Sequence, residues 1–306
     1  MSRDRPPAVS VLVTVLDGAD LARAAVESML AQTLGDIEVI VVDDGSTDGT
    51  PDVLRELRDR RLRIVAHPEH VGRTRCLNDA VGLARADVVA IMDSDDLSFP
   101  HRLERQVRAL EIDPRLDLVG SRMLRIDDAG RVLGVGPGPD AVDHEALRAG
   151  AWRSIPIPHP TWCGRRRWFE RHPYRQWLRC SEDHEVLYRA FPTSRFACLA
   201  DVLVVKREAE LGLPTLLRRR SWCAASGLVA DLGAGRWRRA GVLTVRTAGA
   251  AARFTLRGGS YDRTWRWSPA DGDVVAGYER LRHTFVGDET PGVPRGAGDH
   301  FDPGRA

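Results

Sequence analysis

One stretch of the sequence decides the fold: Val88-Val89-Ala90-Ile91-Met92-Asp93-Ser94-Asp95-Asp96. Its five leading apolar residues predict a buried strand, because parallel strands that are covered on both faces carry near-continuous hydrophobic runs. Three carboxylates follow within four residues, at the end of that strand. Ligands of open α/β sheets bind at the carboxyl ends of the strands, and hard divalent cations prefer carboxylate oxygen. The stretch therefore indicates a metal and ligand site, with a solvated acidic turn before the next helix as the alternative.

Composition excludes several classes of protein. The 306-residue chain has a formal net charge of +2, which disfavours a nucleic-acid-binding role. Its 5 cysteines are scattered without a C-x-x-C pair, which argues against a disulfide scaffold and a zinc site. The N-terminus does not resemble a signal peptide, and no apolar run approaches the length of about 18 residues that spans a membrane. We expect a cytoplasmic protein and keep contact with the inner face of the membrane as an open alternative.

Strands and helices alternate along the first part of the chain. Besides the strand that begins at Val88, the patterns predict strands at 9–15, 37–42 and 62–66 and helices at 21–32, 51–58 and 72–85. This order implies a mostly parallel sheet with right-handed crossovers. The carboxyl ends of its strands would bring the acids after residue 42 and those after residue 92 to one edge of the sheet.

The second part of the chain has a less regular pattern. It predicts helices at 100–110, 143–149 and 181–191, strands at 116–125 and 196–205, a turn at 127–130 with a return at 132–133, a loop at 134–140 and an extended segment at 155–161. Two or three helices are expected within 211–257. We divide the chain into a flexible N-terminus (1–7), a main domain (8–207), a mainly helical extension (208–287) and a disordered tail (288–306).

Several motifs in register resemble those of inverting family 2 glycosyltransferases of the GT-A fold. They are Val9–Val15, the run Val41-Val42-Asp43-Asp44-Gly45-Ser46-Thr47-Asp48-Gly49-Thr50, the segment 72–80, Met92-Asp93-Ser94-Asp95-Asp96, Pro100-His101-Arg102-Leu103, His159-Pro160-Thr161 and Ser181-Glu182-Asp183-His184-Glu185. The resemblance covers roughly residues 8–207. It implies a Rossmann-like, mostly parallel sheet flanked by helices, to which the C-terminal helical extension is added.

By this resemblance, the residues that bind the donor nucleotide are Thr14, Asp17, Asp43, Arg73, Asp93 and Ser94. Asp43 would accept a hydrogen bond from the imide of the base, since a carboxylate bonds strongly to N–H. Asp95, together with Asp93, would hold a divalent metal, Mg²⁺ or Mn²⁺, that neutralises the diphosphate as it leaves.

The resemblance also implies that Asp183 is the general base that takes the proton from an acceptor hydroxyl. The alternative is that Glu182 and Asp183 only cap the helix that they begin. His159 and Glu182 would contact the acceptor or the donor sugar, although His159 could instead pack against Trp162.

Two further features carry open alternatives. Arg165-Arg166-Arg167 could contact the diphosphate or an anionic acceptor, or form a solvated face, and Trp162 and Trp168 could stack on a sugar or pack in the core. The arginine-rich region after residue 207 could meet an anionic membrane and a lipid-linked acceptor, or cover the edge of the sheet.

The predicted function is a metal-dependent, inverting transfer of a sugar from a nucleoside diphosphate, for which the resemblance favours a UDP-sugar, to a hydroxyl acceptor that is lipid-linked or a glycan. One rival is a catalytically silent sugar-nucleotide-binding protein, which the presence of Asp43, Asp93, Asp95 and Asp183 together disfavours. A nucleotidyltransferase would need a Gly-rich basic loop after the first strand, where this chain has the acidic Leu16-Asp17-Gly18-Ala19-Asp20.

Overall fold

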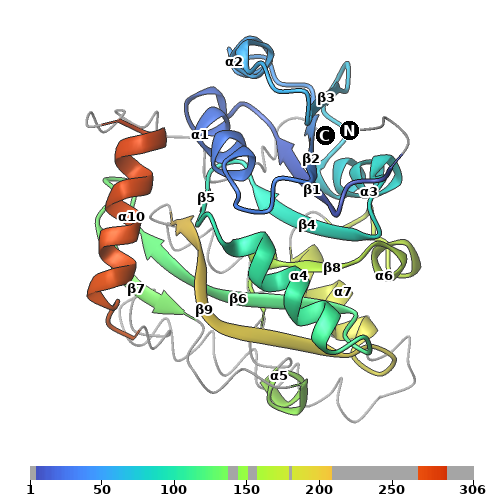
Figure 1. The fold of residues 1–306 in the computed structure, drawn as a ribbon. Helices are drawn as coiled ribbons and strands as arrows, with labels where there is room; N and C mark the ends of the chain where they lie inside the picture. Colours follow the sequence, from blue (N-terminus) through green and yellow to red (C-terminus); the bar gives the residue numbers. More distant parts are fainter. Residues whose placement is uncertain (1–4, 137–143, 151–156, 179–180, 209–267, 288–306) are drawn as a thin grey trace, which may run out of the picture.

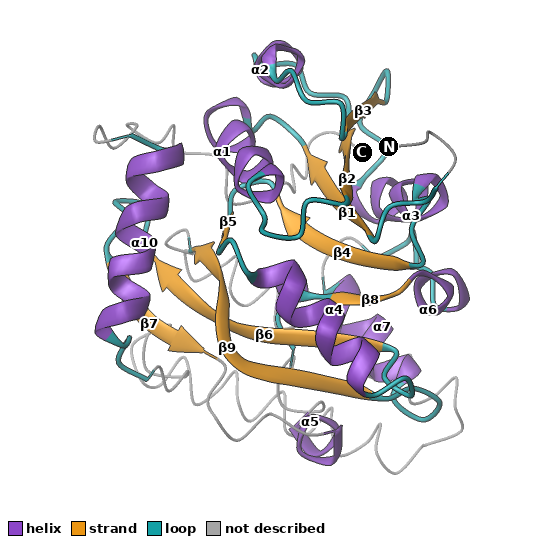
Figure 2. Ribbon diagram, viewed as in Figure 1, coloured by secondary structure: helices purple, strands orange, loops and turns teal. Residues whose placement is uncertain are grey.

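The computed structural model describes residues 5–136, 144–150, 157–178, 181–208 and 268–287, which form one nine-stranded sheet with helices on both faces (Figure 1, Figure 2). The strands are β1 (Val9–Val15), β2 (Ile37–Asp43), β3 (Leu62–Ala66), β4 (Val88–Asp93), β5 (Leu97–Ser98), β6 (Leu118–Ile126), β7 (Val132–Gly136), β8 (Cys163–Arg165) and β9 (Phe196–Arg207). The helices are α1 (Ala19–Leu30), α2 (Thr50–Glu56), α3 (Arg73–Leu83), α4 (Arg102–Ile112), α5 (His144–Gly150), the 3₁₀ helix η1 (His159–Thr161), α6 (Arg166–Arg171), α7 (Glu182–Ala190) and α10 (Gly272–Phe285). The predicted α/β fold is confirmed.

The sheet has the strand order β3-β2-β1-β4-β8-β6-β9-β5, and β7 pairs with the other side of β6. Strands β3, β2, β1 and β4 are parallel, as the alternating pattern predicts. Strand β8 is antiparallel to both β4 and β6, and β5 and β7 are antiparallel to their neighbours. The sheet is therefore parallel in its N-terminal half and mixed in the other half, where β5 and β8 are too short to show a hydrophobic run in the sequence.

Side chains of the central strands alternate between two buried cores, one on each face of the sheet. In β1, Leu12 packs with residues of α3, α6 and α7, whereas Val11 and Val13 pack with residues of α1 and α4 on the opposite face. All three of these side chains are fully buried. This double burial explains the largely apolar sequences of β1, β2 and β4.

Helix α10 packs along the far part of the sheet, beside β6, β7 and β9 (Figure 1). Its Tyr278 and Leu281 share a third apolar cluster with Leu124, Ile126 and Val205, and the Tyr278 hydroxyl donates to the Gly130 carbonyl at 2.9 Å. The arginine-rich segment 209–267 and the predicted tail at 288–306 lie outside the described residues. In the described part of the chain, no helix has the combination of length and apolarity needed to cross a bilayer.

Two local predictions were wrong. Residues 134–136 belong to β7 rather than to a loop, since they pair with β6. Residues 159–161 form the 3₁₀ turn η1 rather than an extended segment: the N–H of Trp162 donates to the His159 carbonyl, and the Thr161 hydroxyl donates to the Pro158 carbonyl at 2.7 Å. A proline restricts the residue before it, but the fixed φ of Pro160 itself suits a turn.

Candidate active site

The loops that follow β1, β2 and β4 meet at one edge of the sheet. In the β-ladder, Thr14 pairs with Asp93, and Val15 pairs with Asp43. Asp43 and Asp93 are buried, and Thr14 is half-buried between them. The prediction that the two acidic loops share an edge is confirmed.

The loops after β1 and β2 are joined by side-chain to backbone hydrogen bonds. Asp17 Oδ1 accepts from the N–H groups of Thr47 (2.7 Å) and Asp48 (3.3 Å), and the N–H of Asp17 donates to Ser46 Oγ at 2.9 Å. Asp43 Oδ1 accepts from the N–H of Ser46 at 3.0 Å. The exposed Asp17 therefore shapes the loop, and its φ of 47° is one of two positive values among the described non-glycine residues.

Asp44 fixes the start of α3. Its Oδ1 accepts from the N–H groups of Val71 (2.8 Å) and Gly72 (3.0 Å), and His70 Nδ1 lies 3.0 Å from its Oδ2. The side chain is almost completely buried. These contacts place Arg73, the first residue of α3, at the edge where β4 ends.

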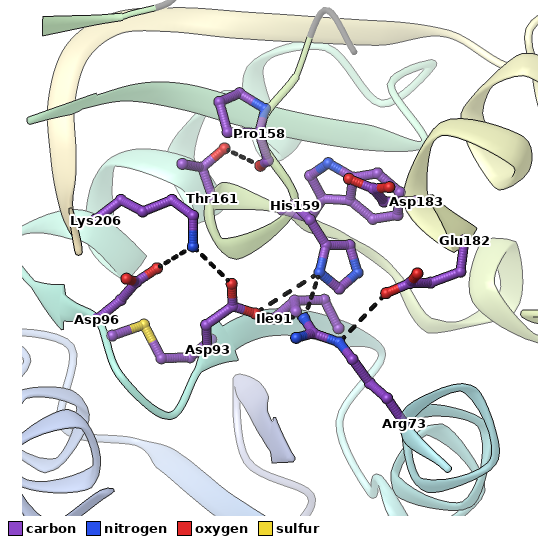
Figure 3. A network of polar contacts seen from close by, with 12 residues as sticks. Arg73, Ile91, Asp93, Asp96, Pro158, His159, Thr161, Glu182, Asp183 and Lys206 are labelled. Carbon is purple, nitrogen blue, oxygen red and sulfur yellow. Dashed lines mark hydrogen bonds and ion pairs between the residues drawn. The ribbon is translucent and has the colours of Figure 1, made fainter. Parts of the chain in front are cut away.

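Arg73 connects the acidic loop after β4 to the start of α7 (Figure 3). Its Nη2 lies 2.5 Å from Asp93 Oδ1 and 3.2 Å from His159 Nδ1, and its Nε lies 3.3 Å from Glu182 Oε1. Burial opposes the charge of Arg73, but the negative charges of Asp93 and Glu182 outweigh burial and raise the pKa of the guanidinium. Four predicted site residues from distant parts of the sequence thus form one network.

The acidic loop contains a cluster of three carboxylates. One oxygen from each of Asp93, Asp95 and Asp96 lies within 4.8 Å of the other two. Lys206 Nζ, from β9, lies 3.1 Å from Asp93 Oδ2 and 3.3 Å from Asp96 Oδ2, and the N–H of Arg207 donates to Asp96 Oδ1 at 3.0 Å. No described residue donates a hydrogen bond to the Asp95 carboxylate. This set of hard oxygen donors fits a divalent cation. Asp95 is the member whose carboxylate oxygens accept no hydrogen bond from the described residues.

The pKa values of the two buried acids of the cluster, Asp93 and Asp96, are shifted in opposite directions. Burial alone would raise the pKa of Asp93, but the positive charges of Arg73 and Lys206 hold it well below its usual range. Burial raises the pKa of Asp96 well above its usual range, and the charges of Asp95 and Asp93 add to this effect against the opposing charge of Lys206. Of the pair, Asp93 is the acid whose ionised form the neighbouring cations favour more.

His159 packs against Trp162, as one of its two alternatives predicts, and it also faces the polar network. Its ring packs edge-on against Trp162 with centroids 4.7 Å apart, and its Nε2 lies 2.8 Å from the Tyr174 hydroxyl. The other ring nitrogen faces Arg73. Tyr174 was not predicted, because an isolated tyrosine in a basic segment gives no sequence signal.

Glu182 and Asp183 begin α7 on the side where Arg73 and His159 lie (Figure 3). The preceding residue, Ser181, has a left-handed φ of 61°, the second positive value among the described non-glycine residues. Asp183 Oδ1 accepts from the N–H of His184 at 2.7 Å, as an acid at a helix N-terminus can. Burial raises the pKa of Tyr174 well above its usual range, and the charges of Glu182, Asp183 and Asp93 contribute. Asp183 is thus within electrostatic reach of the buried network.

Helix α7 is anchored by a buried acid one turn further along. Glu185 is fully buried, and its Oε1 lies 2.9 Å from Arg189 Nε and 3.3 Å from Arg175 Nε. An ionised carboxylate with two guanidinium partners is a specific and costly arrangement to break. Because Arg189 lies in α7 itself, the contact with Arg175 is the one that ties the helix to the segment before it.

Arg165, which ends β8 and begins the run of three arginines, has a structural role. Arg165 pairs with Val88 at the amino end of β4, the end opposite Asp93, and its guanidinium donates to the carbonyls of Leu110 and Leu116. A role of Arg165 in diphosphate binding was therefore a wrong alternative. Trp162 and Trp168 are fully buried, which decides for core packing in both cases.

Comparison with known proteins finds a family match in the N-terminal part of the chain. The model of the family described as glycosyl transferase family 2 matches residues 10–172, which is more than half of the chain. The putative glycosyltransferase EpsE of Bacillus subtilis is 34% identical over 164 residues, or 49% of this chain and 59% of EpsE. The UDP-Glc:alpha-D-GlcNAc-diphosphoundecaprenol beta-1,3-glucosyltransferase WfaP of Escherichia coli is 31% identical over 105 residues, or 34% of this chain and 42% of WfaP. This chain thus spans less than two thirds of either relative.

Among solved structures, the mannosyltransferase PcManGT of Pyrobaculum calidifontis, in complex with GDP-Man and Mn²⁺, is similar in fold. The TM-score is 0.60 at 21% sequence identity, and the match covers 93% of this chain and 84% of that one. At this identity the likeness establishes the shared GT-A type of fold.

Proposed function

The chain belongs to glycosyl transferase family 2, and from this premise we propose that it transfers a sugar from a nucleoside diphosphate to a hydroxyl group of an acceptor. One observation carries the proposal: Arg73 bridges Asp93 of the acidic loop and Glu182, the neighbour of Asp183. Residues proposed to bind the donor are therefore joined in one network with Glu182, the residue that precedes the proposed base.

On the donor side, Thr14, Asp17, Asp43, Asp93 and Ser94 would surround the nucleoside. Asp43 and Asp93 are buried acceptors, which suits them to N–H and O–H groups of a base and a ribose. Asp17 would act mainly through the loop that it holds.

A divalent metal, Mg²⁺ or Mn²⁺, would be held by Asp95 with Asp93 and Asp96. When bound, such an ion neutralises the charge that develops on the departing diphosphate. The Mn²⁺ in the PcManGT complex supports this assignment. Arg73 adds a fixed positive charge beside the same oxygens.

On the acceptor side, Asp183 would accept the proton of the hydroxyl that attacks the anomeric carbon from the face opposite the diphosphate, so that the configuration inverts. A carboxylate is ionised at neutral pH and can fill this role once the hydroxyl is within hydrogen-bond reach. Glu182 would hold Arg73, and His159 would border the sugar.

We favour a UDP-sugar as the donor and a lipid-linked or glycan hydroxyl as the acceptor. The name of WfaP, which specifies UDP-Glc and a diphosphoundecaprenol-linked sugar, supports both choices. A lipid-linked acceptor would bring the protein to the cytoplasmic face of a membrane.

A thermal-shift screen of UDP, GDP, dTDP and their sugars, with Mn²⁺ or with EDTA, tests the proposal. A ligand that binds only the folded state raises its stability, by about 2.7 kcal/mol at a hundredfold excess over Kd. We expect one nucleotide class to stabilise the protein in Mn²⁺ and Asp95→Ala to remove the Mn²⁺-dependent part. Asp52→Ala is the matched control, since that side chain is 82% exposed on α2. If no nucleotide shifts the transition of the wild type under any condition, the proposed function is wrong.

A further inference from the structure

Lys206 is the only lysine of the chain, whose 45 Lys and Arg residues otherwise consist of arginine. In a chain so rich in arginine, a site that needs only a positive charge would be expected to carry arginine. Lys206 stands at the end of β9, inside the polar network rather than on a solvated face. Lysine and arginine differ in shape and in the arrangement of their donors, so the contacts of this ammonium can be compared with those that a guanidinium would make.

Lys206 contacts two buried carboxylates. Its Nζ contacts Asp93 Oδ2 and Asp96 Oδ2 together, at 3.1 and 3.3 Å, and the Asp96 side chain has no exposed surface. An ammonium is a compact point charge, whereas a guanidinium is a wide planar fork. The compact group lies between these two carboxylates as a point charge, which is the position that a bound cation would take.

Lys206 also keeps a donor for a ligand. An ammonium has three N–H donors, and the described residues supply two acceptors, Asp93 and Asp96. The side chain is 24% exposed, and one N–H is left without an acceptor among the described residues. A phosphate oxygen is the acceptor that a lysine ammonium commonly binds as a point charge.

We propose that Lys206 is a built-in cation of the carboxylate cluster, which competes with a divalent ion for Asp93 and Asp96 and donates a hydrogen bond to the diphosphate of the donor. Asp95 is then the carboxylate through which the divalent ion enters. The cluster binds the ion weakly without a nucleotide, and the diphosphate keeps a metal-independent part of its affinity. The diphosphate contact rests on the proposed function, whereas the competition for the acids does not.

Titration of Mn²⁺ alone, followed by the electron paramagnetic resonance signal of the free ion, tests the competition. Lys206→Met removes a like charge and frees two carboxylates, so Mn²⁺ should bind at least about tenfold more tightly than to the wild type. Arg55→Met removes one positive charge from an exposed position on α2 and should leave the Mn²⁺ affinity unchanged. An affinity of folded Lys206→Met at or below that of the wild type overturns the proposal.

A double variant decides the case if Lys206→Met does not fold. Asp96→Asn with Lys206→Met removes the lysine together with one of the acids that it neutralises, so the net charge of the cluster is kept. Because Asp93 is released, this variant should still bind Mn²⁺ more tightly than the wild type. Equal or weaker binding overturns the proposal.

Calorimetric binding of UDP and of GDP, in EDTA and in saturating Mn²⁺, tests the diphosphate contact. In EDTA, Lys206→Met should bind the nucleotide at least about tenfold more weakly than the wild type, since one charge-assisted hydrogen bond is lost. Unchanged affinity in EDTA overturns the contact. If neither nucleotide binds the wild type under either condition, the proposed function fails, and the Mn²⁺ titration still judges the role of Lys206.

Discussion

Replacing Glu38 by glutamine tests how the amino ends of the central strands are held together. Glu38 lies in β2 and is 4% exposed. Its Oε1 accepts from Ser10 Oγ at 2.6 Å and from the N–H of Arg85 at 2.8 Å, and its Oε2 accepts from Arg85 Nε at 2.8 Å. Ser10 Oγ in turn accepts from the N–H of Ala86 at 3.0 Å. One carboxylate thus ties β1 and β2 to the segment that leads into β4.

The expected loss of stability follows from the hydrogen bonds that a glutamine at this position can still accept. Its carbonyl oxygen can still accept from Ser10 and from the N–H of Arg85, but each bond changes from a charged acceptor, worth about 1.5–3 kcal/mol, to a neutral one, worth about 0.5–1.5 kcal/mol. The Arg85 side chain is 58% exposed, so its ion pair adds only about 0–1 kcal/mol. We expect Glu38→Gln to lower the free energy of unfolding by about 2 kcal/mol at pH 7.

The effect has a pH dependence with a definite sign. Burial alone would raise the pKa of Glu38, but the hydrogen bonds from Ser10 and Arg85 outweigh burial and lower it below the ordinary value of 4.5. A lowered folded-state pKa gives stability that is complete above the pKa of the unfolded chain and is lost as the pH falls through the folded-state pKa. The difference between wild type and Glu38→Gln should therefore be constant from pH 7 to about pH 5 and shrink below that.

Urea unfolding at a series of pH values from 7 to 3.5 measures this difference. Glu111→Gln, an exposed position on α4, is the matched control and should change the free energy of unfolding little at any pH. The reasoning is refuted if Glu38→Gln is as stable as the wild type at pH 7, or if the deficit does not shrink in acid.

Three further predictions concern the site and its loops. Asp183→Asn should bind the nucleoside diphosphate as the wild type does but lose about 10²–10⁴-fold in turnover, and a product assay that finds full turnover would show that Asp183 is not the base. Arg73→Met should weaken nucleotide binding by about 10–100-fold in calorimetry because Asp93 loses its buried partner, whereas Arg75→Met, 51% exposed on the same helix, should not. Gly45 has a φ of 77°, and a Cβ there would lie 2.5 Å from the backbone of a neighbouring loop, so Gly45→Ala should lower the free energy of unfolding by about 1–3 kcal/mol. Gly82 lies in α3 with open space around it, so Gly82→Ala should raise the free energy of unfolding by about 0.5–1 kcal/mol. Thermal unfolding that shifts the stability of both glycine variants in the same direction would contradict this reasoning.

The parallel half of the sheet could be predicted from the sequence because its physical cause is local. Strands β1, β2 and β4 are buried on both faces, so each shows as a largely apolar run. A helix follows β1 and β2 directly, and it follows β4 after the short strand β5. The short strands β5 and β8 show no such run. Their pairing depends on partners far away in the chain, Val205 for Leu97 and Ala90 for Cys163, which no local pattern encodes.

The acidic residues of the site could be predicted because several motifs stand in register, but the cations that face them could not. Arg73 was found only through its place beside a family motif. Lys206 follows an ordinary apolar strand and is surrounded by no motif, although it is the only lysine in the chain, which was the one available signal. A contact between residues 93 and 206 is set by the pairing of β9 with β6 and β5, so it exists only once the sheet has formed.

The net charge of the chain does not predict which charges meet at the site, because that depends on the fold. A formal charge of +2 over the whole chain disfavoured a binder of polyanions, yet the edge of the sheet where β4 ends holds two fixed cations among its acids. Screening in salt removes interactions between exposed charges beyond about 8–10 Å, whereas the buried Asp93 responds mainly to the groups that touch it. Its lowered pKa is set mainly by Arg73 and Lys206 against burial. What a diphosphate would meet at this edge is therefore decided by which cations the fold brings within 3–4 Å of the carboxylates, a quantity that depends on the topology of β9 and α3 and not on composition.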